Sequence, residues 1–343
     1  MNLFRAEFRR LSKRAVTRWT LLVVLGVLAV AVAGTWFTNH KPGPDVLALA
    51  EQRAYAEYEE QKRWWEENLD YEIAACERSQ QTGDGFWPDD FDCASLADQG
   101  PRPEDFSAEW YLPPTFEFRY EFSAMITVFV ALLALYAFVV GASFVGAEWR
   151  TGGMMNLLLW QPRRLRVLLA KLVVLLLSLL GIGLVLGAAW TGVMWLVATF
   201  RGITETTTAE VWGSFGLNWL RGLVLVLVTG LIGFTAASIG RHTALAMGVA
   251  TGAVVIGVPG ALIGAQIAGA DYPEAWVWPT YVIAWMDKSV TLRNWNACNY
   301  GVGGCEPAEW VVTWQTSGIA MGVLAVVLVA AAMWRMARRD IAG

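Results

Sequence analysis

The chain has 343 residues, of which 56% are hydrophobic and only 16% are charged, whereas soluble domains carry roughly 25% charged residues. Together with a mean hydropathy of +0.42, this composition excludes an ordinary soluble protein and indicates an integral membrane protein. The net charge of −4 says little about partners until the charges are placed along the chain.

Six stretches are long and apolar enough to cross a hydrocarbon core about 30 Å thick, which takes a helix of about 20 residues. Because a bilayer offers no water to irregular backbone, each stretch is predicted to be a helix. The sequence therefore predicts an all-α integral membrane protein with six transmembrane helices. The six predicted spans are residues 19–37, 122–146, 172–200, 223–240, 243–270 and 311–334. None of these spans has Lys, Arg, Asp or Glu in its interior.

Basic residues gather in four segments that an even number of spans places on one side of the membrane. By the positive-inside rule this side is the cytoplasm, so both termini are predicted to be cytoplasmic. The four segments are residues 1–18, 147–171, 241–242 and the tail, 335–343. Residues 31–33 (Ala-Val-Ala) suit a signal-peptide cleavage site, but the long apolar run and the basic lead favour an uncleaved anchor.

Residues 1–18 are predicted to form an amphipathic elbow helix that lies in the plane of the membrane interface. Phe4, Phe8, Leu11 and Ala15 recur at helical spacing, while arginines such as Arg9 occupy the other face. Such a helix places its aromatic rings against acyl chains and its cations near anionic headgroups. Two compatible roles stay open, a membrane anchor and an elbow that contacts a cytoplasmic partner.

The segment between the first two spans, residues 38–121, has 20 acidic residues against 7 basic ones between His40 and Glu121. It is predicted to be a mostly helical extracellular domain, with a long helix from Pro44 to about Gln80. Apolar residues recur there at a spacing of three to four, namely Leu47, Ala50, Ala54, Tyr58, Trp65, Leu69, Ile73 and Cys76. The domain is either a stabilising lid or an acidic surface that gathers or releases cationic amphiphiles.

All four cysteines fall on the predicted outer side, where disulfides persist. Cys76 and Cys93 lie in the first outer segment, and Cys298 and Cys305 lie before the sixth span. Local pairing, Cys76 with Cys93 and Cys298 with Cys305, is predicted, although a sequence does not strictly determine connectivity. The neighbouring segments have no histidine, which disfavours a metal site.

Residues 147–171, between the second and third spans, are the most informative segment. Its two glycines permit a sharp change of direction, and its proline ends the short Met- and Leu-rich helix predicted for residues 154–160. That helix is too short to span the membrane, so either a partner groove or the lipid headgroups must cover it. The characteristic residues, in chain order, are Glu148, Arg150, Gly152, Gly153, Met154, Leu157, Leu158, Pro162, Arg164 and Lys171.

This order of features resembles the cytoplasmic loop of ABC-2 type permeases, the membrane-spanning subunits of ABC exporters. There an acidic residue, a Gly-rich turn, a short Leu-rich helix, a proline and basic residues precede the third span. The resemblance implies that the residues just named form a coupling segment that docks on a separate ATP-binding subunit. It also implies a dimer with a second copy or a paralogue, ATP and Mg on the partner subunit, and a multi-pass location in the bacterial plasma membrane. The long segment 38–121 departs from the family, in which this loop is often short.

Small and aromatic residues mark the last third of the chain, after the outer loop 201–222. Gly248-x-x-x-Gly252 and Gly260-x-x-x-Gly264 place small residues on one face of the fifth span, which predicts ordinary packing inside the bundle in preference to a dimer contact. Within residues 271–310, the aromatic stretch 276–285 is predicted to lie at the outer interface. By the family resemblance it is a re-entrant helix pair.

No chemistry is expected on this chain itself, and no cofactor or metal. It lacks a G-x-x-x-x-G-K-[ST] loop for ATP phosphates and has only two histidines, His40 and His242. The absence of charge inside the spans disfavours an ion-coupled pump or channel. The expected function is therefore an exporter permease for an apolar or amphipathic cargo such as a drug, peptide or lipid-like molecule. The alternatives are a membrane receptor or immunity protein whose outer domain binds a ligand without transport and, third, a membrane enzyme.

Overall fold

The computed structural model describes residues 2–82, 91–154, 163–301 and 304–338. Six helical stretches are long and apolar enough to cross a membrane, which agrees with the six predicted spans. They are α2 (Ala15–Thr38), α4 (Phe118–Arg150), α6 (Arg164–Arg201), α7 (Ala209–Gly240), the stretch Thr243–Ile267 and α11 (Trp314–Arg338). Most of the predicted outer loop 201–222 is the first part of α7, because the helix begins well before its apolar stretch.

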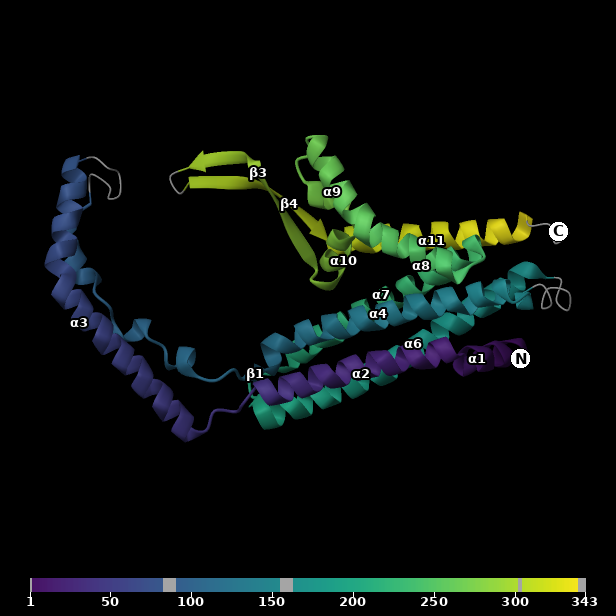
Figure 1. Ribbon diagram of the computed structural model, residues 1–343, viewed down its shortest axis with the longest axis horizontal. Coiled ribbons are helices and arrows are strands. Elements are labelled where there is room, and N and C mark those ends of the chain that lie inside the picture. The colour runs from purple at the N-terminus through teal and green to yellow at the C-terminus, as the bar shows by residue number, and fades with distance from the viewer. Residues whose placement is uncertain (1, 83–90, 155–162, 302–303, 339–343) are drawn as a thin grey trace. The chain divides into compact units, whose positions relative to one another are not determined.

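The chain divides into two units, each of which is described by itself. The membrane unit comprises residues 1–33, 118–196 and 205–343, and the α3 unit comprises residues 34–117 and 197–204. In the membrane unit, α4 is the central helix, since 72% of its most apolar stretch is buried, against 44% for α7 and 33% for α6. α4 and α7 lie side by side (Figure 1).

Glycines bring the backbones of α4 and α7 into direct contact. A Cβ atom at Gly141 would lie 2.3 Å from the carbonyl oxygen of Gly230, and one at Gly233 would lie 2.3 Å from the carbonyl oxygen of Phe138. Any larger residue therefore meets backbone, which has little freedom to move aside. Close helix approach through small residues is a common source of stability inside membranes, where hydrophobic burial between helices contributes little.

Gly141→Ala is therefore expected to lower the free energy of unfolding by about 1–3 kcal/mol, although alanine is the better helix former. The measurement is the midpoint of thermal unfolding in mild detergent. Gly213→Ala in α7 is the matched control, because a Cβ at that position would meet nothing within 4 Å beyond its chain neighbours and its own helix backbone. An unchanged midpoint for Gly141→Ala would contradict the close contact.

The elbow is a separate helix, α1 (Asn2–Lys13), and the helical conformation is interrupted at Arg14 before α2 begins. This interruption differs from the single amphipathic helix predicted for residues 1–18. Only one position of the predicted apolar face, Leu11, is buried, whereas Phe4 and Phe8 are about half exposed. The aromatic rings are therefore free to face lipid.

The fifth long stretch consists of α8 (Thr243–Gly252), the π-helical turn η4 (Ala253–Gly257) and α9 (Val258–Ile267). The turn ends two residues before Pro259, whose ring would clash with the carbonyl four residues earlier in a regular helix and whose nitrogen donates no hydrogen bond. α8 packs within the bundle through Ala246, which meets Ala142 and Ala237, but the glycine face predicted for this packing does not take part. A Cβ at Gly248, Gly252, Gly260 or Gly264 would meet no described atom within 4 Å beyond its chain neighbours and its own helix backbone.

Between α9 and α11 the structure corrects the predicted helix pair. One 3₁₀ turn, η5 (Pro273–Trp276), and one short helix, α10 (Trp278–Met286), precede a hairpin of β3 (Ser289–Gly301) and β4 (Gly304–Thr313). From Ser289 to Trp295 in β3, exposed side chains alternate with buried or half-buried ones, a strand pattern rather than a helical one. Leu292 and Val312 pack against Ala284 of α10, so the hairpin begins on the short helix (Figure 1).

The α3 unit is built on the long helix α3 (Pro44–Thr82), as predicted. Three 3₁₀ turns follow it, η1 (Cys93–Gln99), η2 (Pro103–Asp105) and η3 (Ala108–Tyr111), and η1 and η3 contact α3. The predicted stripe packs around the disulfide, with Trp65, Leu69 and Ile73 against Leu96, whereas Leu47 is exposed. The short strand β1 (Phe116–Glu117) pairs in parallel with β2 (Gly202–Ile203).

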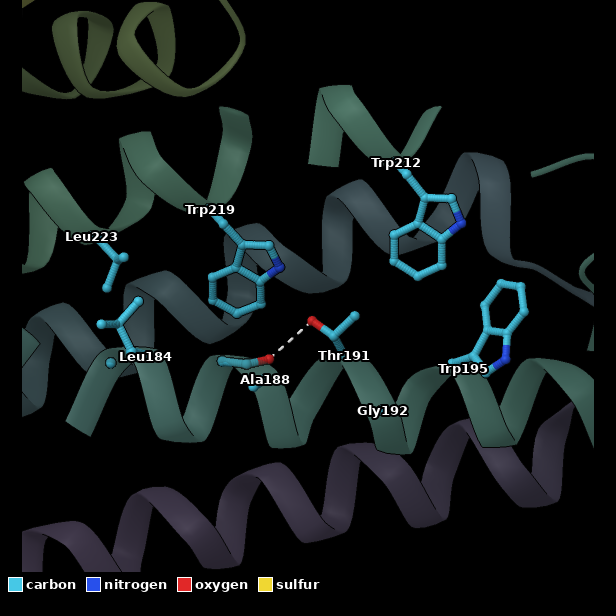
Figure 2. Close-up of a pocket in the computed structure, with 10 residues that line it drawn as sticks. Leu184, Ala188, Thr191, Gly192, Trp195, Trp212, Trp219 and Leu223 are labelled. Atoms are coloured by element: carbon cyan, nitrogen blue, oxygen red, sulfur yellow. Dashed lines mark hydrogen bonds between the residues drawn. The ribbon is translucent and has the colours of Figure 1, made fainter. Parts of the chain in front are cut away.

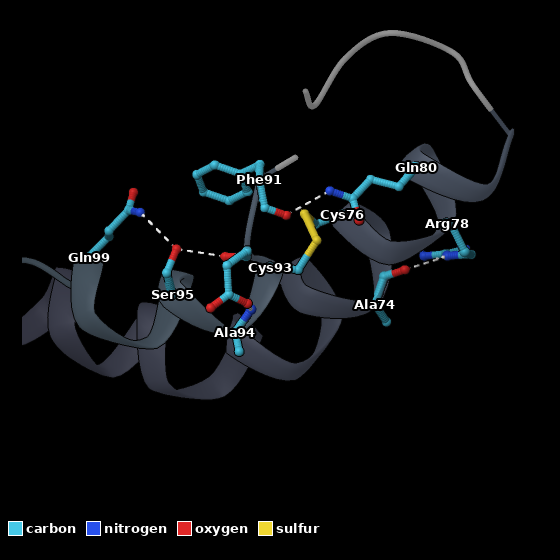
Figure 3. Close-up of a disulfide and its surroundings, with 10 residues drawn as sticks. Ala74, Cys76, Arg78, Gln80, Phe91, Cys93, Ala94, Ser95 and Gln99 are labelled. Carbon is cyan, nitrogen blue, oxygen red and sulfur yellow. Dashed lines mark hydrogen bonds between the residues drawn. A yellow bond between two sulfur atoms is a disulfide. The ribbon is translucent and has the colours of Figure 1, made fainter. Parts of the chain in front are cut away.

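The predicted disulfide between Cys76 and Cys93 is confirmed (Figure 3). It joins α3 to η1, and beside it the side-chain amide of Gln80 donates a hydrogen bond of 2.7 Å to the carbonyl oxygen of Phe91. Both ends of the segment 83–90, which lies outside the described residues, are thereby fixed. Cys298 and Cys305 lie on β3 and β4, but their side chains lie outside the part that the structure describes, so their pairing stays a prediction.

Candidate functional site

Four charged side chains form a buried cluster at one end of the membrane unit, which we call the base cluster. Its centre is Lys171, whose ammonium group is fully buried and lies 2.5 Å from Glu7 Oε2 and 2.8 Å from Glu148 Oε2. The fourth member, Arg14, lies 2.9 Å from Glu148 Oε1 and donates a 2.6 Å hydrogen bond to the carbonyl oxygen of Ser143. Two cations and two carboxylates make the cluster neutral, as burial of charge requires.

The ring of Phe144 lies next to both cations of the base cluster. Its centroid is 5.2 Å from the guanidinium carbon of Arg14 and 4.8 Å from the Lys171 nitrogen. An aromatic face attracts a desolvated cation, so this ring helps to replace the water that burial removes. A further arginine, Arg10, is 3.1 Å from Glu7 on the solvent side, where a single ion pair contributes little.

The base cluster joins three elements. Glu148 is in the last turn of α4, Lys171 is near the start of α6, Glu7 is in α1, and Arg14 lies between α1 and α2. The residues between Glu148 and Lys171 are the predicted coupling segment. Ion pairs therefore connect the two ends of the coupling segment to each other and to α1.

The remaining residues of the predicted coupling segment fall into two groups. Arg150 is exposed and Met154 is buried, while Gly152 adopts a left-handed backbone (φ 70°) where α4 ends, a conformation that glycine adopts without strain. The predicted change of direction thus begins at Gly152. Leu157, Leu158 and Pro162, like most of the predicted short helix 154–160, lie outside the described residues, so that helix stays a prediction.

Sequence reasoning did not identify the roles of Glu7 and Arg14. A signal was present, because Glu7 is the only acidic residue among the first 18 and stands among six bases. The spacing from Glu7 through Leu11 to Arg14 places the three residues on one helical face. A lone acid on the apolar side of a basic amphipathic helix indicates a buried cationic partner, but not which one.

A second candidate site is an apolar pocket of about 600 Å³ between α6 and α7, which we call the tryptophan pocket (Figure 2). α6 contributes mostly small residues together with Leu184 and Trp195, and α7 contributes large residues that face them across the space. The one lining hydroxyl, that of Thr191, donates a 2.9 Å hydrogen bond to the carbonyl oxygen of Gly187 within its own helix. The lining residues are Gly183, Leu184, Gly187, Ala188, Thr191, Gly192, Trp195, Trp212, Trp219 and Leu223.

Aromatic packing fixes the shape of the tryptophan pocket. The rings of Trp195 and Trp212 are 5.3 Å apart, and that of Trp219 meets Phe129 of α4 edge-on at 5.0 Å. The volume lies in the range of small-molecule sites, which are concave, mostly apolar and largely preformed. This pocket suits an apolar ring system or chain rather than an ion or a sugar.

Comparison with known proteins gives one positive result. A family model described as ABC-2 family transporter protein matches residues 1–341. The match includes all four members of the base cluster, the six long helical stretches and the α3 unit. No curated protein and no solved structure matches the chain.

Proposed function

This chain belongs to the ABC-2 family of transporters, and from that premise we propose that it is the permease of an ATP-driven exporter. In this proposal the segment between Glu148 and Lys171 docks on a separate ATP-binding subunit, which binds ATP and Mg and performs the hydrolysis. The base cluster is the observation that carries the proposal. A force on the segment reaches α4, α6 and the elbow together, because charged groups of all three meet at Lys171.

The base cluster also refines the docking role of the segment. Glu148 and Lys171 are buried against each other, so we assign them the positioning of the segment and not direct contact with the partner. The exposed Arg150 and the apolar residues 155–160 are the proposed contact residues. Docking by adaptable Met and Leu side chains would contribute about 25 cal/mol for each Å² buried.

The proposed exporter is a dimer of this chain with a second copy or a paralogue. Its support is the stretch Thr243–Ile267, of which only 6% of the most apolar part is buried. Four glycines lie along it without a neighbouring helix against them, and such small-residue faces let helices from two chains approach closely. In the assembly we place the base cluster on the cytoplasmic side and the disulfide-closed α3 unit outside.

The proposed cargo is apolar or amphipathic. Its support is the tryptophan pocket, which is almost entirely apolar, together with the absence of charge from the interiors of the predicted spans. Desolvating a strongly charged substrate in such surroundings would be costly. A receptor without transport, the alternative from the sequence, receives no support from a transporter-family match over nearly the whole chain.

Purification of the tagged chain in mild detergent tests the proposal directly. We expect a stoichiometric soluble chain that hydrolyses ATP in the presence of Mg to co-purify. Replacing residues 155–160 with a Gly-Ser linker of equal length should abolish co-purification and leave membrane insertion intact. The matched control is Trp64→Ala on α3, an exposed position that should change neither.

Two outcomes would contradict the proposal. If no ATP-hydrolysing chain accompanies the folded protein, the permease assignment lacks its partner. If the linker variant retains that chain in full stoichiometry, docking occurs elsewhere on the molecule. Ligand affinity in the α3 unit, without a partner, would instead indicate the receptor.

A further inference from the structure

The outer face of α1 carries three cations that the base cluster leaves uncompensated. Arg5, Arg9 and Lys13 are exposed and have no ion-pair partner among the residues that the structure describes. Their spacing of four residues makes each a direct neighbour of the next, and like charges at that spacing repel one another. Together with Arg10 they line a hollow of about 580 Å³. This surface therefore favours an anion.

An apolar pocket of about 440 Å³, which we call the elbow pocket, lies on the adjoining side of the same helix. On α1 its lining includes Phe8 and Ser12, which form the helical row next to the cationic one, since Arg5 and Arg9 precede them by three residues. α2, α4 and α6 supply the rest, mostly Leu, Ile and Val side chains. The cationic hollow and the elbow pocket are therefore lined by adjacent rows of side chains on α1.

Two buried hydroxyl groups belong to the elbow pocket. Tyr136 is 1% exposed and Thr17 is 8% exposed, and neither hydroxyl oxygen has a hydrogen-bond partner within the described ranges. Nearly all buried polar groups in proteins are hydrogen-bonded. Both oxygens are enclosed by the protein, so these hydroxyl groups do not select the bound molecule, and the pocket offers it an apolar surface.

We propose that the elbow is a binding site for an anionic phospholipid of the bilayer. The phosphate lies against Arg5, Arg9 and Lys13, and one acyl chain fills the elbow pocket. Charge complementarity selects the headgroup, and the apolar lining selects the chain. A free phosphate would leave the elbow pocket empty, and an acidic protein surface has no acyl chain with which to fill it.

The site adjoins the base cluster without sharing its charges. α1 presents Glu7 on its buried face and the three cations on its outer face, so a lipid that holds the outer face also holds Glu7 next to Lys171. Occupancy of the site would therefore stabilise the elbow in this position. The inference does not rest on transport or on an ATP-binding partner.

Lipid binding to the full-length chain, delipidated in detergent, tests the headgroup. Native mass spectrometry would count bound molecules of phosphatidylglycerol, of phosphatidylcholine with the same acyl chains, and of glycerol 3-phosphate. We expect phosphatidylglycerol to bind about tenfold more tightly than phosphatidylcholine. The double variant Arg5→Gln/Arg9→Gln should lower its affinity about 25-fold, or about fivefold for each cation removed.

The acyl chain is tested by a pair of glycine variants. Gly181 on α6 lines the elbow pocket, whereas Gly213 on α7 lines neither the elbow pocket nor the tryptophan pocket, and a Cβ at either position would meet nothing within 4 Å beyond its chain neighbours and its own helix backbone. Gly181→Leu should lower phosphatidylglycerol affinity at least about tenfold, the equivalent of burying two methylene groups fewer. Gly213→Leu should leave it unchanged.

Three results would overturn the proposal. Equal affinity for the two phospholipids would remove the selection by charge. Binding of glycerol 3-phosphate as tight as that of phosphatidylglycerol would identify a phosphate site without a chain. Equal affinities in the Gly181→Leu and Gly213→Leu variants would place the chain outside the elbow pocket.

Discussion

Replacing Lys171 with methionine is expected to cost about 3–5 kcal/mol of stability, the largest loss for any single substitution considered in this chain. Methionine preserves most of the side-chain volume but removes the charge that Glu7 and Glu148 share. Both carboxylates then stay buried, and only Arg14 remains to compensate them inside the cluster. The measurement is the midpoint of thermal unfolding in mild detergent.

Two variants separate charge from packing in this experiment. The double variant Glu7→Leu/Lys171→Met leaves the Arg14–Glu148 pair, which is neutral, so most of the lost stability should return, as it does when a buried ion pair is replaced by apolar groups. Arg166→Met, an exposed arginine less than two turns away on α6, should change the midpoint little. A Lys171→Met protein as stable as Arg166→Met would show that the base cluster does not hold the elbow.

Glu7→Gln is expected to lower transport per ATP hydrolysed by about tenfold, while the ATP-binding subunit remains bound. The proposed coupling passes through Lys171 to α1, and glutamine removes the charge by which α1 takes part. Coupling energies between sites are typically about 1–3 kcal/mol, or 5–150-fold. Reconstituted vesicles that report cargo movement and phosphate release together would measure the ratio.

A matched carboxylate provides the control for this prediction. Glu210 lies exposed in the first turn of α7, so Glu210→Gln should leave the ratio of transport to hydrolysis unchanged. If Glu7→Gln lost the subunit as well, Glu7 would act on docking itself. If Glu7→Gln changed neither the binding of the subunit nor the ratio of transport to hydrolysis, the elbow would be a membrane anchor that plays no role in coupling.

Features that depend on local sequence could be predicted, and the structure agrees with them. The six long helices follow from runs of about 20 apolar residues. The helix from Pro44 follows from a spacing of three to four, and η1 and η3 contact that helix. The pairing of Cys76 with Cys93 was one of several connectivities, and proximity along the chain favoured it.

Features that depend on distant parts of the chain could not be predicted. Glu7 and Lys171 are 164 residues apart, and a pattern on one helix does not identify its partner on another. Glycines at every fourth position indicate that a second backbone approaches, but not whether it belongs to the same chain. The pattern therefore predicts that Gly248 and Gly260 pack within the bundle, whereas the structure has close backbone contacts at other glycines, among them Gly141 and Gly233.

The aromatic segment before the sixth span shows a further limit of prediction from sequence. Its apolar character predicts a location at the outer interface for residues 276–285, and α10 covers nearly all of them. From Ser289 to Trp295 in β3, which follows α10, exposed side chains alternate with buried or half-buried ones, and the family resemblance does not predict the hairpin that results. Composition identified the apolar segment, but the period of the pattern determines whether the neighbouring residues form a helix or a strand.

The backbone contact between α4 and α7 constrains how this permease can move. Where Gly141 meets Gly230 and Gly233 meets Phe138, sliding or rotating one helix against the other would drive a side chain into a carbonyl group. The two helices are therefore expected to move as one rigid unit, and the ion pair between Glu148 and Lys171 connects this unit to α6. The π-helical turn η4 interrupts the regular helix of the stretch Thr243–Ile267 shortly before Pro259, so bending within that stretch is expected there.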